Sequence, residues 1–304
     1  MITSLPYPGL VRAWLSFIRP KTWGVAIAPV VAALALVFLE HRTFSPIVAL
    51  LTLTLSITMQ IITNMENDLG YTQRKAEKSN RKGLPRATAN GWISITAARR
   101  AILLMVALGL LNTVYLVYVG GWGFLLIGCT SMIAAYCYMG GPIPIAYTPF
   151  GEVMVLIFFG LMAVCGTYYL QAMSVSTNAV LLGCALGSTA ASVLAVNNWR
   201  DREHDASIAR RTLAVVASDR GFQFIFAAML LLPFIVLLVM SWQLQSFWVL
   251  LPLVLLIRLP DLLRRFTTLS GYDLNTVMFA CVKLGLLYAT LFTAGVGLEL
   301  ALGS

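Results

Sequence analysis

A polar stretch that could bind a metal ion follows the apolar run 179–196. Five of the nine residues from Asn197 to Asp205 are Asp, Glu or Arg, in a chain that is only 11% charged. If the apolar helix continues through them, Asn197, Asp201 and Asp205 lie at i, i+4 and i+8 on one helical face. Two carboxylates and a carboxamide facing one way suit Mg²⁺, which proteins hold through one or two carboxylates plus substrate phosphates. The alternative is a helix end with ordinary solvated charges.

A second stretch repeats this spacing far away in the chain. Asn64 and Asp68 follow the apolar run 47–62 with the same N-x-x-x-D pattern as Asn197 and Asp201. Two such patterns at the ends of apolar runs favour two helices that converge on one polar site. We therefore prefer a site to a coincidence, although the repeat is too short to establish an internal duplication.

The composition indicates a polytopic membrane protein. The chain has 304 residues, of which 59% are hydrophobic, and a mean hydropathy of +0.84. A soluble protein of this length could not bury that much apolar surface. The net charge of +9 does not indicate nucleic-acid binding, because the basic residues lie in short loops between apolar runs. The five cysteines have no paired spacing and the two histidines are too few for a histidine-rich metal site.

We expect an all-α bundle, because apolar runs of roughly 20 residues span a bilayer as helices. About nine spans are predicted, near residues 22–39, 47–66, 101–119, 121–139, 152–172, 179–199, 222–241, 246–260 and 278–299. Gly120 and Gly121 predict a tight turn between the third and fourth spans, and Pro252 predicts a kink in the eighth. Gly, Ala and Ser between Gly183 and Ser192 predict close helix packing.

The loop charges predict the orientation. Lys and Arg are concentrated before the first span, in the loop at about 64–100, in the loop at about 197–221 and after Pro260. The positive-inside rule then puts the amino terminus and both aspartate motifs in the cytoplasm, and an odd number of spans puts the carboxyl terminus outside. The site would lie at the cytoplasmic side of a single integral-membrane domain, residues 1–304. Lys283, inside the ninth span, either faces a cavity or extends to the interface.

Taken together, these features predict a substrate that has a diphosphate head and a long hydrocarbon tail. The acids can hold Mg²⁺, Arg and Lys can bind phosphate oxygens, and the apolar helices offer a groove. Candidates to neutralise the phosphates are Lys78, Arg81 and Arg200. A polyprenyl diphosphate matches all three features. The basic loop alone is weak evidence, because the positive-inside rule would supply it in any case.

Five stretches, in this order along the chain, resemble the UbiA-type membrane prenyltransferases. They are Arg19–Thr22, Asn64–Gly70, Tyr138–Pro144 with Gly151 and Glu152, Phe158–Gln171, and Asn197–Asp205 with Arg211–Ala214. The likeness is greatest to the menaquinone-pathway branch, the 1,4-dihydroxy-2-naphthoate polyprenyltransferases. The resemblance implies a nine-helix bundle around a central cavity that opens to the cytoplasmic side of a bacterial inner membrane.

The resemblance also implies the reaction and its residues. In a Mg²⁺-dependent reaction, a polyprenyl group would pass from its diphosphate to an aromatic acid. The product would be demethylmenaquinone when the acceptor is 1,4-dihydroxy-2-naphthoate. The expected catalytic residues are Asn64, Asp68, Asn197, Asp201 and Asp205, with Mg²⁺ on Asp68, Asp201, Asp205 and Glu77. The expected substrate contacts are Lys21, Asn67, Lys78, Arg81, Tyr138, Arg200 and Lys283.

The first motif departs from the family pattern. Tyr71 stands where a second aspartate is expected, and Glu77 and Asn80 stand where the branch often has aspartates. A neutral phenol is a poor Mg²⁺ ligand, so either the first metal position is weakened or the chain has diverged in activity. Three alternatives stay open: another acceptor such as 4-hydroxybenzoate, an inactive binding-only relative, or a transporter. The sequence leaves the prenyl chain length and the oligomeric state open.

Overall fold

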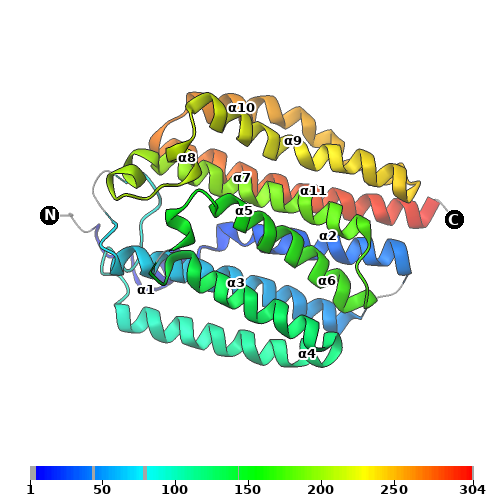
Figure 1. The fold of residues 1–304 in the computed structure, drawn as a ribbon, viewed down its shortest axis with the longest axis horizontal. Coiled ribbons are helices and arrows are strands. Elements are labelled where there is room, and N and C mark those ends of the chain that lie inside the picture. The colour runs from blue at the N-terminus through cyan, green and yellow to red at the C-terminus, as the bar shows by residue number, and fades with distance from the viewer. Residues whose placement is uncertain (1–4, 43–44, 78–80, 143, 303–304) are drawn as a thin grey trace.

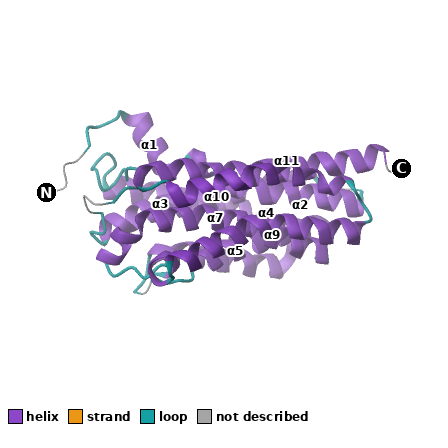
Figure 2. Ribbon diagram, turned by 90° about the horizontal axis from the view of Figure 1, so that it is seen from above, coloured by secondary structure: helices purple, strands orange, loops and turns teal. Residues whose placement is uncertain are grey.

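The chain folds into a bundle of roughly parallel and antiparallel helices, as a computed structural model describes it for residues 5–42, 45–77, 81–142 and 144–302. The described residues contain helices and loops and no strand (Figure 2). The first helix, α1 (Leu10–Ile18), lies at one end of the bundle and the last turn of α11 (Leu274–Leu302) at the other (Figure 1). The prediction of an all-α membrane bundle is thus confirmed.

Seven helical segments of the described chain are long and apolar enough to cross a membrane. They are α2 (Gly24–His41), α3 (Pro46–Gln73), α4 (Ile95–Met139), the joined α5 (Gly151–Leu156), η3 (Ile157–Met162) and α6 (Ala163–Ala172), α7 (Thr177–Ser207), α9 (Asp219–Leu244), and η5 (Gly271–Asp273) joined to α11. Shorter elements complete the described chain: η1 (Pro20–Thr22), η2 (Ile145–Tyr147), α8 (Leu213–Val216), η4 (Trp248–Arg258) and α10 (Leu259–Thr268).

Two local features explain why this number differs from the predicted nine. The backbone of α4 leaves the helical region at Gly121, with φ 69° and ψ −166°, so the element holds both the third and the fourth predicted spans. Glycine suits this position because a Cβ would strain a positive φ. The eighth predicted span is η4, an 11-residue 3₁₀ segment with Pro252 inside it. It is too short to count by itself, and the number of membrane crossings stays a prediction.

Small residues allow one very close helix contact, as the glycine-rich sequence predicts. A Cβ on Gly160 of η3 would lie 2.4 Å from the Gly183 carbonyl oxygen and 2.4 Å from the Gly187 Cα, both on α7. Backbone atoms cannot move aside as a flexible side chain can. The α5–η3–α6 segment is therefore held directly against α7, the helix that carries the second aspartate motif.

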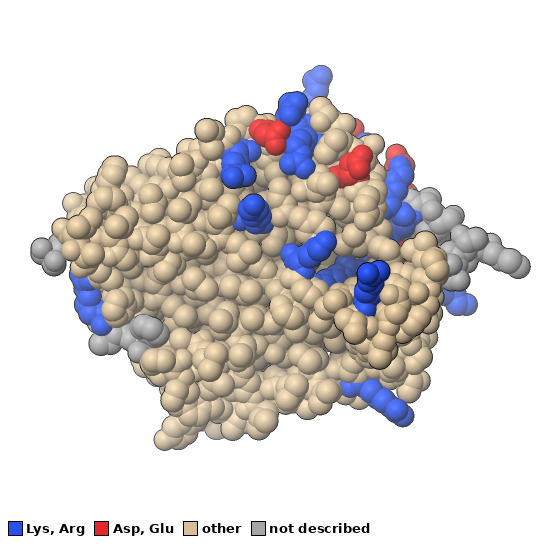
Figure 3. Space-filling model, turned by 180° about the vertical axis from the view of Figure 1, so that it is seen from behind, with Lys and Arg blue, Asp and Glu red and all other residues tan. Residues whose placement is uncertain are grey.

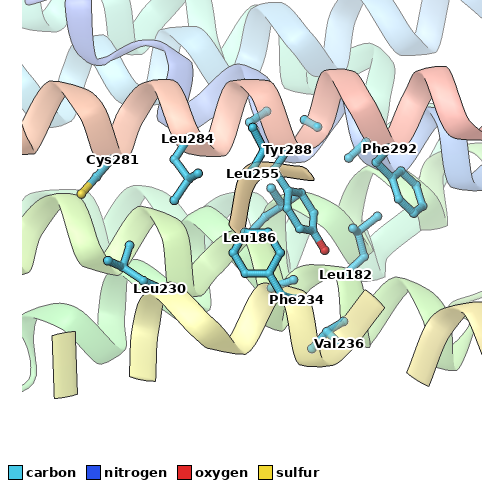
Figure 4. Packing of buried hydrophobic residues seen from close by; sticks show 14 of the residues in the cluster. Leu182, Leu186, Leu230, Phe234, Val236, Leu255, Cys281, Leu284, Tyr288 and Phe292 are labelled. Carbon is cyan, nitrogen blue, oxygen red and sulfur yellow. The ribbon is translucent and has the colours of Figure 1, made fainter. Parts of the chain in front are cut away.

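The largest buried apolar cluster lies where α7, α9 and α11 pack together (Figure 4). Helix α9, which packs in this cluster, has a buried proline inside it. Pro233 of α9 has no N–H to bond the Met229 carbonyl, and the Ser188 hydroxyl of α7 donates to that oxygen at 2.8 Å. The Tyr288 hydroxyl of α11 donates to the Pro233 carbonyl at 3.0 Å. The Ser188 hydroxyl of α7 thus satisfies a backbone carbonyl that the proline leaves without its helical partner, and Tyr288 adds a bond from α11 to α9.

Charge is distributed unevenly over the surface. Most of the Lys and Arg side chains visible on one face of the molecule gather toward the end that holds α1 and the longer loops (Figure 3). Much of the remaining surface of that face carries no charged side chain, which suits contact with lipid. Both aspartate motifs lie toward the charged end, since Asp68 is near the end of α3 and Asp205 near the end of α7.

Candidate functional site

The site is built from the last turns of α3 and α7 and from the loop that follows α3. The three aspartates of the two motifs, Asp68, Asp201 and Asp205, are buried, with at most 3% of each exposed. Buried carboxylates require partners, because an isolated charge away from water is costly. The partners differ among the three acids, and they indicate what each acid can still bind.

Asp68 is held by backbone amides and a hydroxyl of the loop after α3. Its two carboxylate oxygens accept hydrogen bonds from the Ala87 N–H at 3.0 Å, the Thr88 N–H at 3.0 Å and the Thr88 hydroxyl at 2.6 Å. Arg19 Nη2 lies 4.0 Å from Asp68 Oδ2. Asp68 therefore fixes the position of residues 87–88, and both of its oxygens are already engaged.

Asp201 and Asp205 lie one turn apart on α7 and are paired with arginine side chains. Arg200 donates to both oxygens of Asp201, at 3.0 and 2.6 Å, and Arg81 Nη1 lies 3.5 Å from Oδ2. Asp205 Oδ1 accepts from Arg210 Nη1 at 3.0 Å. Asp205 Oδ2 is buried and has no hydrogen-bond partner among the described residues. This orphaned oxygen is available to a ligand that the protein itself does not supply.

Guanidinium groups surround these acids. Arg81 donates to Glu77 at 2.8 and 2.9 Å, and Arg86 Nε lies 3.3 Å from the same carboxylate. Burial alone would lower the pKa of Arg81, but the charges of Glu77 and Asp201 raise it overall. Burial and the Arg81 charge lower the pKa of Arg86. Burial, with a contribution from Arg86, lowers the pKa of Arg19 to about 9, so Arg19 is still charged at neutral pH.

Tyr71 lies at the centre of this cluster, where the resembled family has an acid. The side chain is buried, with the Arg86 guanidinium 3.6 Å above its ring centroid. Its hydroxyl bonds Arg210 and donates to Asp205 Oδ1 at 3.4 Å. Position 71 therefore faces the second motif directly. The Tyr71 side chain contacts Asp205, Arg210 and Arg86. The first motif therefore has one carboxylate fewer than the family pattern.

The asparagines of the motifs also have defined partners. Asn64 donates to the Ile18 carbonyl and the Thr22 hydroxyl, each at 3.1 Å, and so joins α3 to η1. Asn67 accepts from Arg86 at 3.3 Å, and Asn197 accepts from Arg200 at 2.5 Å. Next to it on α7, Asn198 donates to Glu152 at 2.9 Å. Amide groups thus orient the charged residues around them.

A cavity of about 260 Å³ begins at this polar cluster and continues between the helices. Arg19, Asn64, Asn67 and Asn197 line its polar end, and Tyr138 also lines it. Apolar side chains line the rest, among them Phe124, Ile127, Phe158, Phe159 and Met162. The arrangement can hold a polar head near the acids and an apolar chain along the helices. Which side of the membrane the polar end faces stays a prediction.

Several predicted residues lie elsewhere. Lys21 is exposed, with its ammonium 5.5 Å from the centre of the Phe279 ring, and Lys283 is exposed on α11; neither lines the cavity. Lys78 and Asn80 lie outside the described residues. In the matched stretch Phe158–Gln171, Tyr168 lies at the far end of the bundle. Its hydroxyl donates to Glu40 and lies 2.8 Å from His41 Nε2, while Asn178 donates to Glu40 at 2.9 Å.

Sequence reasoning did not assign a role to four residues that contact the site. They are Arg19, Arg86, Arg210 and Glu152. Arg19 and Glu152 belong to stretches that carry the family resemblance, and this was the available signal. Arg86 and Arg210 belong to basic loops that the positive-inside rule explains equally well, so nothing local distinguishes them.

The residues fit a divalent ion at the second motif better than at the first. No group of three His, Cys, Asp or Glu side chains in the described part of the chain is arranged to hold a metal ion. Mg²⁺ needs fewer protein ligands than that, because it keeps waters and binds substrate phosphates. The orphaned Oδ2 of Asp205 meets this requirement. Asp201 lies on the same face of α7, and its oxygens accept hydrogen bonds from the Arg200 side chain.

Comparison with known proteins gives a consistent match. The sequence model described as the UbiA prenyltransferase family matches residues 26–296. The chain is 34% identical to a 1,4-dihydroxy-2-naphthoate octaprenyltransferase of Escherichia coli (strain K12) over 244 residues, which are 78% of this chain and 79% of that protein. It is 32% identical to the protein of the same name from Haemophilus influenzae over 256 residues, or 80% and 83% of the two chains.

Solved structures share the fold at low sequence identity. A UbiA homolog from Archaeoglobus fulgidus, bound to GPP and Mg²⁺, has a TM-score of 0.66 and 16% identity, and the match covers 94% of this chain and 99% of that one. A digeranylgeranylglyceryl phosphate synthase has a TM-score of 0.62 and 14% identity, with coverage of 94% and 98%. At this level of identity the likeness concerns the arrangement of helices alone.

Proposed function

Since the chain belongs to the UbiA prenyltransferase family, we propose that it transfers a polyprenyl group from a polyprenyl diphosphate to 1,4-dihydroxy-2-naphthoate, with Mg²⁺ as cofactor. It is an integral-membrane aromatic prenyltransferase. The acceptor is inferred from the names of the relatives, which are octaprenyltransferases for this naphthoate. We also infer a single domain in a bacterial inner membrane, with the amino terminus in the cytoplasm and the carboxyl terminus outside.

The cavity is the observation that carries this proposal. Its polar end is lined by the Arg19 guanidinium and by the amides of Asn64, Asn67 and Asn197, and its walls are apolar. Asp68 and Asp201 lie close behind this lining, next to Asn67 in α3 and one turn after Asn197 in α7. A diphosphate at that end would meet Arg19 and lie near Arg200, whose planar groups suit phosphate oxygens. A prenyl chain would contact the side chains of α3, α4 and η3. A substrate with an anionic head and a hydrocarbon tail fits both parts.

The residues of the chain divide the chemistry between them. When bound at Asp201 and Asp205, Mg²⁺ would neutralise negative charge on the departing diphosphate. The allylic carbon–oxygen bond breaks with its electron pair going to the diphosphate, whose charge Arg19, Arg81 and Arg200 offset. Phe158, Phe159 and Met162 keep water from the allylic cation. The ring carbon that bears the carboxylate then forms the new carbon–carbon bond, and its bond to the carboxylate breaks, which releases CO₂ and returns the electron pair to the ring.

Product mass tests the proposal directly. Purified protein, Mg²⁺ and a polyprenyl diphosphate are incubated with a panel of aromatic acids. We expect the mass of a prenylated, decarboxylated product with 1,4-dihydroxy-2-naphthoate. A product with 4-hydroxybenzoate alone would assign another acceptor, and no product with any donor or acceptor would contradict the enzyme activity.

A further inference from the structure

We propose that this chain uses one divalent ion, held by Asp201 and Asp205, and that the Arg86 guanidinium supplies the positive charge at the first motif in place of an ion. This inference rests on the proposed function, because it concerns how the same site binds a diphosphate. It answers the question that Tyr71 raises: what replaces the missing carboxylate of the first motif.

The first observation is that Asp68 has little capacity left for an ion. Its two oxygens accept three hydrogen bonds, from Ala87 N–H, Thr88 N–H and the Thr88 hydroxyl. Ala87 and Thr88, which provide these donors, are themselves buried beside Asp68. Metal binding at Asp68 would therefore have to break bonds that hold the loop 81–94 against α3, and breaking bonds to a buried charge is costly.

The second observation is that a guanidinium already lies at the first motif. Arg86 is buried, and its Nη1 donates to the Asn67 carbonyl at 3.0 Å and to Asn67 Oδ1 at 3.3 Å. Its Nε is 3.3 Å from Glu77, the other acid near the first motif that the sequence predicts as a metal ligand. Asn67 lines the cavity, so this fixed positive charge lies one residue away from the space for the substrate.

The third observation is that Tyr71 supports Arg86 and has no capacity to bind Mg²⁺ itself. The Arg86 guanidinium lies 3.6 Å from the Tyr71 ring centroid, a cation–π contact in a buried setting. An aspartate at this position would offer a carboxylate but no ring. The replacement of an acid by tyrosine thus removes a metal ligand and adds a support for a cation.

The fourth observation is the contrast with α7. Asp205 Oδ2 is buried and has no hydrogen-bond partner among the described residues, and Asp201 lies on the same helical face. Five buried or partly buried arginines, Arg19, Arg81, Arg86, Arg200 and Arg210, meet four acids, Asp68, Glu77, Asp201 and Asp205. These guanidinium groups, together with one divalent ion at α7, oppose the charge of a diphosphate.

The number of bound ions tests the proposal. Detergent-purified protein is titrated with Mn²⁺, a paramagnetic substitute for Mg²⁺, in the presence of inorganic pyrophosphate, and bound Mn²⁺ is counted by equilibrium dialysis and electron paramagnetic resonance. We expect one Mn²⁺ per chain, with the spectrum of an isolated ion. Two ions per chain with magnetic coupling, or no bound ion, would overturn the proposal. The wild-type count needs no variant and so does not depend on whether variants fold.

Three variants separate the roles. Asp205→Asn should lose the ion, whereas Arg86→Gln should keep it and weaken pyrophosphate binding by about tenfold, because a positive charge beside the cavity is removed. The double variant Tyr71→Asp with Arg86→Gln restores a carboxylate and removes the guanidinium, and we expect it to bind a second Mn²⁺. A double variant that still binds one ion, with the wild-type circular dichroism spectrum, would contradict the exchange of Arg86 for an ion.

The metal count and the proposed function can fail separately. The titration uses pyrophosphate and no acceptor, so its result does not depend on product formation. One Mn²⁺ with no product from any acceptor would overturn the proposed function and leave the one-ion site intact. Product formation by a protein that binds two coupled ions would overturn the one-ion site and leave the proposed function intact.

Discussion

The two aspartate motifs share a spacing but have become different kinds of structure. In α3, Asn64 donates to the Ile18 carbonyl at the end of α1, and Asp68 accepts from backbone amides of residues 87–88, so both residues join segments of the chain. In α7, Asn197 and Asp201 bind a side chain, Arg200, and no loop backbone. The same residue types therefore act mainly as a structural anchor in one helix and remain available to a ligand in the other.

The third position of each motif accounts for the difference. Asp205 lies four residues after Asp201 and keeps an unpartnered oxygen. Tyr71 lies three residues after Asp68 and offers a phenol that bonds Arg210 and Asp205. A spacing pattern thus identifies a candidate site, but the number of free oxygen atoms decides whether it can bind a metal ion.

The largest effect is expected at the second motif. Asp205→Asn removes a hard anionic ligand at nearly constant size, so kcat should fall by about 100-fold or more, equivalent to roughly 3 kcal/mol in the barrier. Turnover measured over a range of Mg²⁺ concentrations tests this. Glu203→Gln is the matched control, because Glu203 is an exposed acid on the same helix and its loss should change turnover little. Equal turnover in Asp205→Asn and wild type would contradict the inference that the second motif, and not the first, binds the metal ion.

At the first motif the expected effect is on stability. Asp68→Asn weakens three hydrogen bonds to a buried charge, which should lower the free energy of unfolding by about 1–3 kcal/mol. Thermal unfolding in detergent measures the loss, and Thr88→Val should lower the melting temperature in the same direction. The Mg²⁺ concentration for half-maximal activity should stay close to that of the wild type. A large rise in that concentration would show that Asp68 binds the ion after all.

A smaller effect is expected for the phenol that links the motifs. Tyr71→Phe removes the hydroxyl bonds to Arg210 and Asp205 but keeps the ring beneath Arg86. Turnover should fall by about tenfold, as expected for a hydrogen bond to a charged group, with an unchanged number of bound ions. Steady-state rates with saturating Mg²⁺ give the result. If Tyr71→Phe bound an additional ion, the hydroxyl and not the ring would be what excludes it.

The smallest effect on turnover is expected at the opposite end of the bundle. Glu40→Gln weakens the contacts with Tyr168 and Asn178, which join α2 to α6 and α7. Turnover should stay within about twofold of wild type, while the loss of a hydrogen-bonded charge should lower stability by about 1 kcal/mol. Parallel measurements of rate and melting temperature test both expectations. A large loss of turnover at full stability would extend the functional region beyond the motifs.

Local sequence patterns were sufficient for much of the fold. Hydropathy predicts the long helices, and Gly120-Gly121 predicts the turn that Gly121 makes within α4. The η4 segment was the exception, since hydropathy over 246–260 does not reveal that the chain there forms a short 3₁₀ helix. Hydropathy measures how apolar a segment is and carries little information about its backbone geometry.

The candidate site could be predicted only in part. The i, i+4 spacing brings Asp201 and Asp205 to one face of α7, because this follows from helix geometry alone. The partners of Asp68 lie at residues 87–88 and depend on the path of a loop, which no local pattern specifies. Lys283 shows a further limit. The sequence gives its position along the helix, but which side of that helix faces lipid depends on tertiary packing.

The proline in α9 has a consequence for how the protein assembles in the membrane. Before α7 and α9 meet, the Met229 carbonyl has no N–H partner from Pro233 and must face lipid or water. An unsatisfied backbone group in hydrocarbon costs several kcal/mol. Docking against α7 relieves this cost only when Ser188 is level with Met229, since its hydroxyl then reaches the oxygen. A shift of α9 by one turn would lose the bond, so a single proline helps to select both the partner helix and the register at which it docks during biogenesis.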